Sequence, residues 1–405
     1  MFLKIGLRNV LRNKRRSFLS CLAIGVGLAA LIFTDGFMLG MKESVVRNVT
    51  ESYLGHAQIH SKGYRINPEI HDTVGNYKGL KSFLDNSDKV DRWAARVNSP
   101  GMISTASNIL NTQIVGVDPE KERRFSKIEE SLVEGKFLEN GSNILIGKEL
   151  ARKLDVRIGE KLVLTAAQLN TGDLSQELFR VSGIFSFGSK QQDSGMVFIT
   201  SNKLLNMLHM EKKYHEIAIK FKDLSISKSK LDPIWKKLDS FGDYDVESWS
   251  DLIPGIMSAL SMSEQSMGYI AIFLLVIVLL GILNNLFMSI FERMFEFGVI
   301  RAIGTRPFNV FKMILSEAMW LALFSVIMGF LVAICCAYLV NINGIDYSGV
   351  EMGETTLREP IYYIANTYQF IYYPILVFVF TFVSAVYPGI FAAKITLSDA
   401  MKKSL

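Results

Sequence analysis

Two sets of residues in this sequence could in principle bind a phosphate or a metal ion, as in enzymes. The segment Gly141–Glu149 carries glycines and a lysine in the manner of a phosphate-binding loop, but its glycines are one residue too far apart. Glu149 also stands where that loop needs a serine or threonine to contact magnesium. The histidines offer no third ligand for a metal site; they are His56, His60, His71, His209 and His215. No Gly-x-Ser-x-Gly elbow is present. We therefore expect no catalytic residue, no metal and no bound cofactor, unless distant residues converge to form a triad.

A different function, the transmission of force, is suggested by the segment 292–306, which reads ERMFEFGVIRAIGTR. Glu292 and Glu296 lie four residues apart, so a helix would carry both on one face. Gly298 and Gly304 would let the chain turn or let another backbone approach closely. On spacing alone, this short charged helix could receive a push from a cytoplasmic motor, or it could be a plain interfacial loop.

Four long apolar runs predict a membrane protein, and two of them flank the segment 292–306. With 49% hydrophobic residues among 405, the chain is too long and too apolar for one ordinary soluble domain. Each run exceeds the roughly 20 residues that cross a bilayer as a helix. The predicted transmembrane helices are 18–41, 267–291, 313–340 and 370–393. Residues 292–306 then join the second and third helices, and a periplasmic loop at 341–369 joins the third and fourth.

The distribution of charge predicts the orientation. The net charge of +5 comes from a basic block ahead of the first run and not from a nucleic-acid-binding surface, because the rest of the chain is close to neutral. Basic segments beside a span stay in the cytoplasm. The N-terminus is therefore expected inside, and four spans return the tail, 394–405, to the same side. Apolar residues interleave with the basic ones in residues 1–17, which favours an amphipathic elbow helix on the inner leaflet over a solvated tail. The basic block consists of Lys4, Arg8, Arg12, Lys14, Arg15 and Arg16.

The long segment 42–266 contains no further apolar run and predicts a periplasmic α+β domain. Alternation with a period of two predicts strands, for example at 111–117 and 178–185, and short helices intervene. A strand-rich subdomain at about 119–200 is expected as an insertion into a more mixed part made from both flanks. The fold class is thus membrane α-helical, with four transmembrane helices, plus an α+β extracytoplasmic domain inserted between helices 1 and 2.

The segment 292–306 resembles the coupling-helix signature E-R-x-x-E-I-G-x-x-R-A-x-G of a permease superfamily, with Phe297 in place of the usual aliphatic residue. This superfamily contains the lipoprotein-release permeases, the macrolide-exporter permease and the FtsX-like cell-division proteins. Further similarities lie at 7–16, 116–119, 146–151 and 387–400. The nearest likeness is to the lipoprotein-release permeases, because Gly55–Tyr64 resembles the start of their ectodomain.

This resemblance implies an ABC transporter permease of the bacterial inner membrane with no ATPase activity of its own. A separate cytoplasmic ABC ATPase of the LolD type would use ATP and Mg and dock on the coupling helix. A second permease subunit, identical or paralogous, would complete the membrane part. The ATPase-coupling residues implied are Glu292, Arg293, Glu296, Phe297, Gly298, Arg301, Ala302 and Gly304.

In the lipoprotein branch, mechanotransmission through the spans lifts lipoproteins from the outer leaflet of the inner membrane to a periplasmic carrier of the LolA type. The alternatives are MacB-like efflux of a peptide or drug and FtsX-like regulation of a cell-wall hydrolase. Extracting a lipid anchor requires an apolar surface, because each methylene loses about 0.8 kcal/mol when it leaves the membrane.

The outer end of the first span offers Phe37, Met38 and Met41 as substrate contacts, since methionine adapts to irregular apolar surfaces. Ordinary packing is the alternative for these three. Asp35 lies either at the membrane interface or near the headgroup of the substrate. The resemblance further implies a hairpin that grips the carrier, for which Leu169 and Leu174 are the candidates, although the prolines common in that hairpin are missing.

Overall fold

The computed structural model describes residues 2–139, 141–169, 172–228, 230–346, 351–352, 355–356 and 360–395. The chain forms two compact units. A helical unit comprises Met1–Glu43, Ala259–Asp346 and Pro360–Leu405, and an ectodomain unit comprises Ser44–Ser258 and Tyr347–Glu359. Most of the predicted tail 394–405, including the end of the family-like segment 387–400, lies outside the described residues.

The helical unit is built from long helices. They are α1 (Phe2–Arg12), α2 (Lys14–Val49), α11 (Pro254–Glu292), α12 (Met294–Ala302), α13 (Pro307–Asn343), α14 (Thr367–Ser384) and α15 (Val386–Lys394). Four segments among the described residues are long and apolar enough to cross a membrane: Lys14–Leu54, Pro254–Glu292, Pro307–Asn343 and Thr367–Lys394. The predicted fold class is confirmed, because an α+β domain lies between the first and second of them.

These helices exceed the predicted spans. The helix α11 has 39 residues, which is about 58 Å at 1.5 Å per residue. Since the hydrocarbon core of a bilayer is about 30 Å thick, part of α11 must project beyond it. The predicted helix 267–291 covers only the most apolar part, because hydropathy reports contact with lipid and not the length of a helix.

The helices pack through apolar side chains and small residues. Leu28 and Ile32 of α2 contact a buried cluster that includes Ile282 of α11. The backbones of α2 and α13 approach closely where Gly25 faces Gly329, because a Cβ at Gly329 would lie 2.6 Å from the Gly25 carbonyl oxygen. Small residues at such crossings allow tight van der Waals packing between spans.

Among the described residues of the ectodomain, ten strands are joined in one hydrogen-bonded sheet. They are β1 (Ala57–Ser61), β2 (Val90–Ser104), β3 (Ile109–Val117), β4 (Leu132–Gly135), β5 (Asn143–Gly147), β6 (Lys161–Ala167), β7 (Leu174–Phe185), β8 (Met196–Thr200), β9 (Glu216–Phe221) and β10 (Tyr244–Ser248). The helices among them are α3 (Tyr77–Asn86), α4 (Pro119–Phe125), α5 (Lys148–Leu154), α6 (Lys190–Gly195), α7 (Ser201–Met207), α8 (Ser225–Lys228), α9 (Pro233–Asp239) and α10 (Trp249–Leu252). A short pair, β11 (Glu351–Met352) and β12 (Thr355–Thr356), belongs to the same unit.

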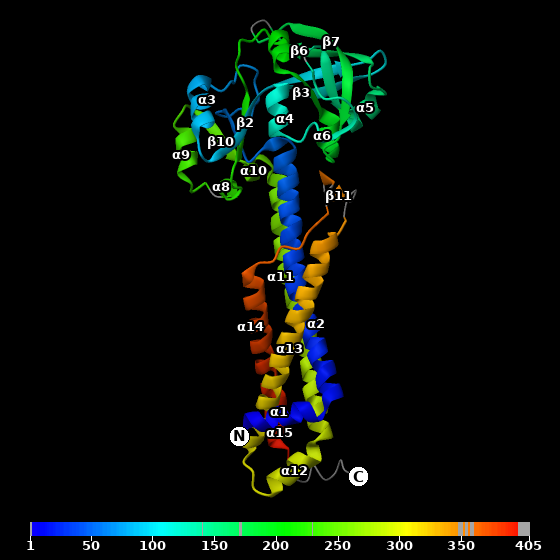
Figure 1. Cartoon of the computed structure of the whole chain (residues 1–405), viewed down its shortest axis with the longest axis vertical. Helices are drawn as coiled ribbons and strands as arrows, with labels where there is room; N and C mark the ends of the chain where they lie inside the picture. The colour runs from blue at the N-terminus through cyan, green and yellow to red at the C-terminus, as the bar shows by residue number, and fades with distance from the viewer. Residues whose placement is uncertain are drawn as a thin grey trace. The chain divides into compact units, whose positions relative to one another are not determined.

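The long strand β2 connects two halves of the ectodomain. Its first half joins an antiparallel sheet in the order β10-β1-β9-β2. Its second half enters a closed barrel, in which β2 pairs with β3, β3 with β8, β8 with β5, β5 with β7, β7 with β6, and β6 again with β2. Apolar side chains such as Ile114, Leu164 and Phe179 fill the barrel. Figure 1 shows the two halves side by side at the top of the view.

The barrel begins earlier in the chain than the insertion expected at about 119–200. Both β2 and β3 precede residue 119, yet they supply two of the strands that close the ring. Alternation along one segment does not reveal which distant strands it pairs with, since register is fixed by tertiary packing.

The segment that imitates a phosphate loop, Gly141–Glu149, is the junction between β5 and α5. A Cβ at Gly147 would lie 2.2 Å from the Asp193 carbonyl oxygen, so this glycine permits close packing of α6 against the junction. The resemblance to a phosphate site therefore reflects a tight strand-to-helix turn.

Candidate functional site at the end of the helix bundle

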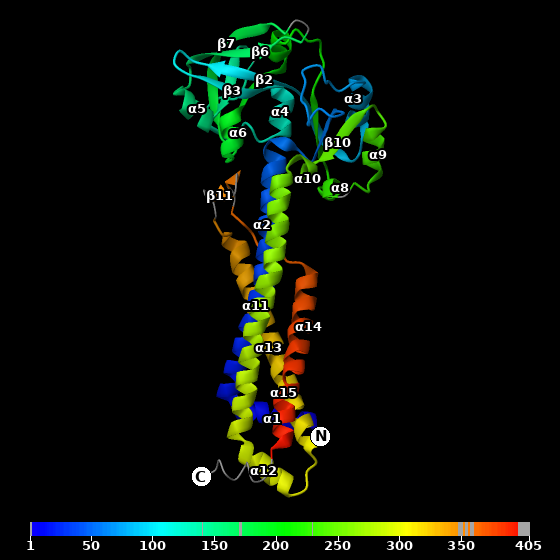
Figure 2. The ribbon, with the colours of Figure 1, turned by 180° about the vertical axis from the view of Figure 1, so that it is seen from behind.

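The segment 292–306 contains the helix α12, which lies at the same end of the bundle as α1 and α15 (Figures 1 and 2). Glu292 is the last residue of α11, and Arg293 breaks the helix with φ −107° and ψ 14°. At the other end, Gly304 adopts φ +102°, and Thr305 N–H donates to the Ile300 carbonyl at 3.3 Å. This is the glycine-terminated C-cap that stops many helices. Pro307 then starts α13 at the position where proline is favoured.

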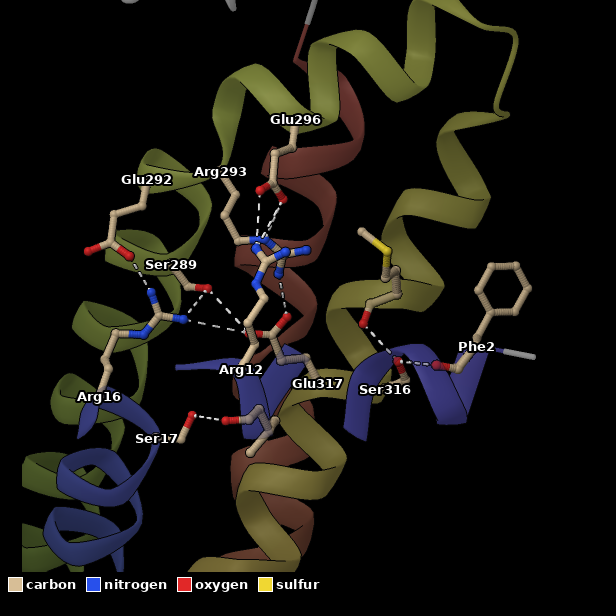
Figure 3. Close-up of polar contacts among 12 residues, drawn as sticks. Phe2, Arg12, Arg16, Ser17, Ser289, Glu292, Arg293, Glu296, Ser316 and Glu317 are labelled. Carbon is tan, nitrogen blue, oxygen red and sulfur yellow. Dashed lines mark hydrogen bonds and ion pairs between the residues drawn. The ribbon is translucent and has the colours of Figure 1, made fainter. Parts of the chain in front are cut away.

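A buried ion pair fixes the start of α12 to α13. The Arg293 guanidinium donates to Glu317 Oε2 at 2.9 Å, and the two side chains are 9% and 4% exposed. The Ser289 hydroxyl of α11 donates to the other oxygen of Glu317 at 3.3 Å. Arg16 of α2 lies 3.8 Å from that oxygen (Figure 3). One carboxylate thus holds together three helices and the junction before α12.

A second, more exposed set of ion pairs joins this junction to the N-terminal elbow. Arg12 donates to Glu296 at 3.1 Å, and Arg16 pairs with Glu292 (Figure 3). The matching four-residue spacing of the two arginines and the two glutamates produces this pairing. Burial acts to raise the pKa of Glu296, but its bonds with Arg293 and Arg12 outweigh burial and lower that pKa below its ordinary value.

The elbow helix α1 is held in place by α13. Trp320 Nε1 donates to the Leu3 carbonyl at 3.0 Å, and the Ser316 hydroxyl lies 3.1 Å from the Phe2 carbonyl. A Cβ at Gly6 would lie 2.5 Å from Ser316 Oγ, so glycine allows α1 to approach α13 this closely. This packing is what presents Arg12 to Glu296.

The remaining predicted coupling residues divide between the inner and outer faces of α12. Phe297 is fully buried in a cluster with Ile314 and Ala392, and Gly298 is buried beside it. Arg301 donates to the carbonyls of Ala393 and Ile395 at 3.1 and 2.6 Å, where a cation complements the C-terminus of α15. Ala302 and Gly304 are exposed.

The outer face of α12 is apolar. Phe295, Val299 and Ile303 are 54%, 39% and 81% exposed. Their spacing places them on one side of the helix. We call these three residues the apolar face of α12. The coupling residues predicted from the sequence did not include these three, although an apolar residue every four positions was the available signal. The charges hold α12 in place, while this apolar face is open to a partner.

Sequence reasoning also missed Glu317, Arg12 and Arg16 as parts of this site. Glu317 lies inside the predicted span 313–340, where a carboxylate is costly and needs a partner, so its position was itself a signal. The two arginines were assigned to the orientation signal and to the elbow helix, and not to this site.

The predicted substrate residues lie along α2, within the helical unit. Asp35, Phe37, Met38 and Met41 are all half-buried. The segment before α14 covers part of this stretch, because Tyr362 contributes a carbonyl 1.9 Å from where a Cβ of Gly40 would stand.

The two predicted carrier contacts differ in their surroundings. Leu174 begins β7 and is 62% exposed. Leu169 instead packs against the barrel core, and its N–H donates to the Leu208 carbonyl at 3.0 Å. Leu174 is therefore open to a partner, whereas Leu169 contributes to the packing of the barrel. Among the described residues, no group of three or more histidine, cysteine or carboxylate side chains could hold a metal ion.

The fold and this site define a class of protein: a four-span membrane protein with an α+β domain after the first span and a short connecting helix after the second. A family model described as MacB-like periplasmic core domain matches residues 17–227, and one described as FtsX-like permease C-terminal matches residues 268–397. The chain belongs to the MacB/FtsX-like permease superfamily and is an ABC transporter permease. This confirms the resemblance drawn from the sequence.

Similar proteins include two lipoprotein-releasing system transmembrane proteins LolC. The one from Xylella fastidiosa is 22% identical over 98% of each chain, and the one from Neisseria meningitidis is 22% identical over 87% of this chain and 91% of its own. Among solved structures, the periplasmic region of MacB from Actinobacillus actinomycetemcomitans covers 53% of this chain and 95% of its own, at 14% identity and a TM-score of 0.36.

Proposed function

We propose that this chain is the permease subunit of a lipoprotein-releasing ABC transporter and that a separate cytoplasmic ATPase docks on the apolar face of α12. The observation that carries the docking site is the exposure of Phe295, Val299 and Ile303 on a helix that ion pairs fix firmly to its neighbours. Apolar anchors surrounded by polar groups are typical of protein interfaces.

The arrangement suits mechanotransmission. A push on α12 reaches α13 through the Arg293–Glu317 pair and reaches α2 through Arg16. It reaches α15 through Arg301. Because these contacts join charged groups to the neighbouring helices, a shift of α12 would displace the helices that carry the spans.

The proposed load is a lipid-anchored protein. The relatives that match over nearly the whole chain are named for lipoprotein release. An acylated protein would leave the outer leaflet beside Asp35, Phe37, Met38 and Met41 and pass to a periplasmic carrier that contacts Leu174. A second permease subunit, identical or paralogous, completes the complex in this proposal, with both termini of the chain in the cytoplasm.

The test is copurification followed by reconstitution. The permease is purified in detergent with its candidate ATPase while ATP hydrolysis is blocked, and bound proteins are identified by mass spectrometry. Acylated lipoproteins in the complex, released by ATP in the presence of carrier, support the proposal. An intact complex without lipoproteins that instead drives peptide or drug export, or activates a wall hydrolase, would replace it with one of those functions.

A further inference from the structure

The end of the first-span helix continues directly into a π turn that is bonded to the ectodomain. The helix α2 ends at Val49, and a π turn, Thr50–Leu54, follows it directly before the chain turns at Gly55 with φ +78°. The last carbonyls of a helix lack partners within the helix and need donors from elsewhere. Single π turns are frequent at functional positions.

Groups of the ectodomain supply these donors. Lys127 N–H lies 3.2 Å from the Glu51 carbonyl and 3.1 Å from the Ser52 carbonyl. Lys220 Nζ donates to the Glu51 carbonyl at 3.3 Å. Arg96 Nη2 donates to the Tyr53 carbonyl at 2.8 Å. Two of the donors are cationic groups at a helix C-terminus, which is the favourable end for positive charge.

Arg96 is the most deeply buried of these donors. Its side chain is fully buried and lies 2.6 Å from Glu122 of α4 and 2.6 Å from Glu216 of β9. Its guanidinium also stacks 3.9 Å above the Tyr53 ring. One guanidinium, carried by β2, therefore contacts the π turn, the helix α4 and the strand β9.

The position of Arg96 on β2 is where the two halves of the ectodomain meet. Arg96 is paired with Glu216 of β9 in the sheet, and the next residue, Val97, is paired with Gly116 of β3 in the barrel. A buried group of one cation and two carboxylates is costly compared with apolar packing. The contacts of Arg96 with the π turn, with α4 and with β9 therefore lie where the end of the first-span helix, the sheet and the barrel meet.

We infer that Arg96 is the positioning residue of a rigid joint that fixes the end of the first-span helix to both halves of the ectodomain. The inference rests on the proposed function, because the joint matters for transport only if movement of the spans drives the ectodomain. With Arg96 in place, the π turn and the ectodomain move as one body. Without it, movement of the helix is absorbed at Thr50–Leu54.

The joint is tested in the full-length permease–ATPase complex. Cys21, Cys335 and Cys336 are replaced by alanine, and nitroxide labels are attached to cysteines introduced at Arg47 and Lys78, both exposed. Double electron–electron resonance then measures the distribution of distances between the label on α2, just before the π turn, and the label on α3 of the ectodomain.

Arg96→Gln alone would leave two carboxylates buried without a cation and is expected to prevent folding. The main variant is therefore the neutral triple Arg96→Met, Glu122→Gln, Glu216→Gln. Arg96→Lys tests rescue by a retained charge. The matched control is Arg180→Gln. It removes the hydrogen bond that the Arg180 guanidinium of the barrel donates to the Gly159 carbonyl.

We expect a narrow distribution in the parent protein and in the control, a broad one in the triple variant, and an intermediate one in Arg96→Lys. ATP-driven release of lipoprotein should fall about tenfold in the triple variant while ATP hydrolysis persists. A folded triple variant with a narrow distribution, or a control that broadens equally, would overturn the joint. A broad distribution with undiminished release would overturn its role in transmission. If the parent protein releases no lipoprotein, the proposed function is contradicted. The distance distributions then still decide whether Arg96 holds the joint rigid.

Discussion

Arg293, which immediately precedes α12, and Glu317 of α13 form a buried ion pair with a nitrogen–oxygen distance of 2.9 Å. The pair explains why a carboxylate is present in an apolar span. It also gives α12 a fixed place relative to the bundle, which a docking surface requires.

Glu317→Gln should destabilise the helical unit, because Arg293 stays buried without an anion. Breaking a buried pair on one side typically costs about 3–5 kcal/mol. The measurement is the fraction of monodisperse protein in detergent after heating. Glu264→Gln is the control, since Glu264 pairs with Lys42 at an exposed position and should cost little. Equal heat stability of the two variants would contradict the central role of Glu317.

Phe295→Asp combined with Ile303→Asp should weaken ATPase binding at least about tenfold, as expected for the loss of apolar hot-spot residues. The permease should still insert and fold, because both side chains are exposed. Copurification of the ATPase measures the effect. Ile66→Asp is the control, because Ile66 is a still more exposed apolar residue of the ectodomain. Undiminished ATPase recovery from the double variant would remove the apolar face from the docking site.

Glu292→Ala combined with Arg301→Ala should also reduce coupling to the ATPase, but by loosening α12. Arg16 would lose its pairing with Glu292, and the carbonyls of α15 would lose their donor. We expect ATPase binding to fall together with heat stability, whereas the apolar-face variant should lose binding alone. Retention of both properties would show that these charges do not position α12.

Stability of the ectodomain should decline as the pH falls from about 6.5 toward 4. Burial and, second to it, the nearby Lys220 cation lower the pKa of His56 to about 4. His56 Nδ1 accepts the Phe221 N–H at 3.0 Å, which requires an unprotonated nitrogen. The unfolded chain therefore binds the extra proton in this pH range, and protonation favours unfolding. Burial lowers the pKa values of His60 and His215 as well.

Thermal unfolding at pH 7.5, 5.5 and 4.5, followed by tryptophan fluorescence, checks this dependence. His56→Asn keeps an acceptor without the titration, so its unfolding temperature should depend less steeply on pH. A slope that is the same in the parent protein and in His56→Asn would argue against His56.

Leu174→Asp should weaken capture of the periplasmic carrier without affecting folding, because Leu174 is exposed at the start of β7. Leu169→Asp should instead lower the heat stability of the ectodomain, because it places a carboxylate against the barrel core. Carrier pull-down together with thermal unfolding separates the two effects. Carrier capture that is unaffected by Leu174→Asp would exclude this residue from the contact.

The apolar runs and the basic block specified much of the architecture from the sequence. Residues that must contact lipid have to be apolar over a whole span, so hydropathy alone located the four membrane segments and the domain between the first two. The segment 292–306 was recognisable as a connecting helix for the same reason. The barrel boundary was less accessible, because β2 and β3 join it through pairing with distant strands.

What only the tertiary structure decided is which charges face which partners. The sequence identified Glu292, Glu296 and Arg301 as important but not as groups that bond within the chain. It did not single out Arg96, although the folded chain surrounds this residue with two carboxylates and a helix end. Hydrophobicity acts residue by residue and can be read along the chain. An ion pair depends on the position of two side chains far apart in sequence, and folding alone brings them within bonding distance.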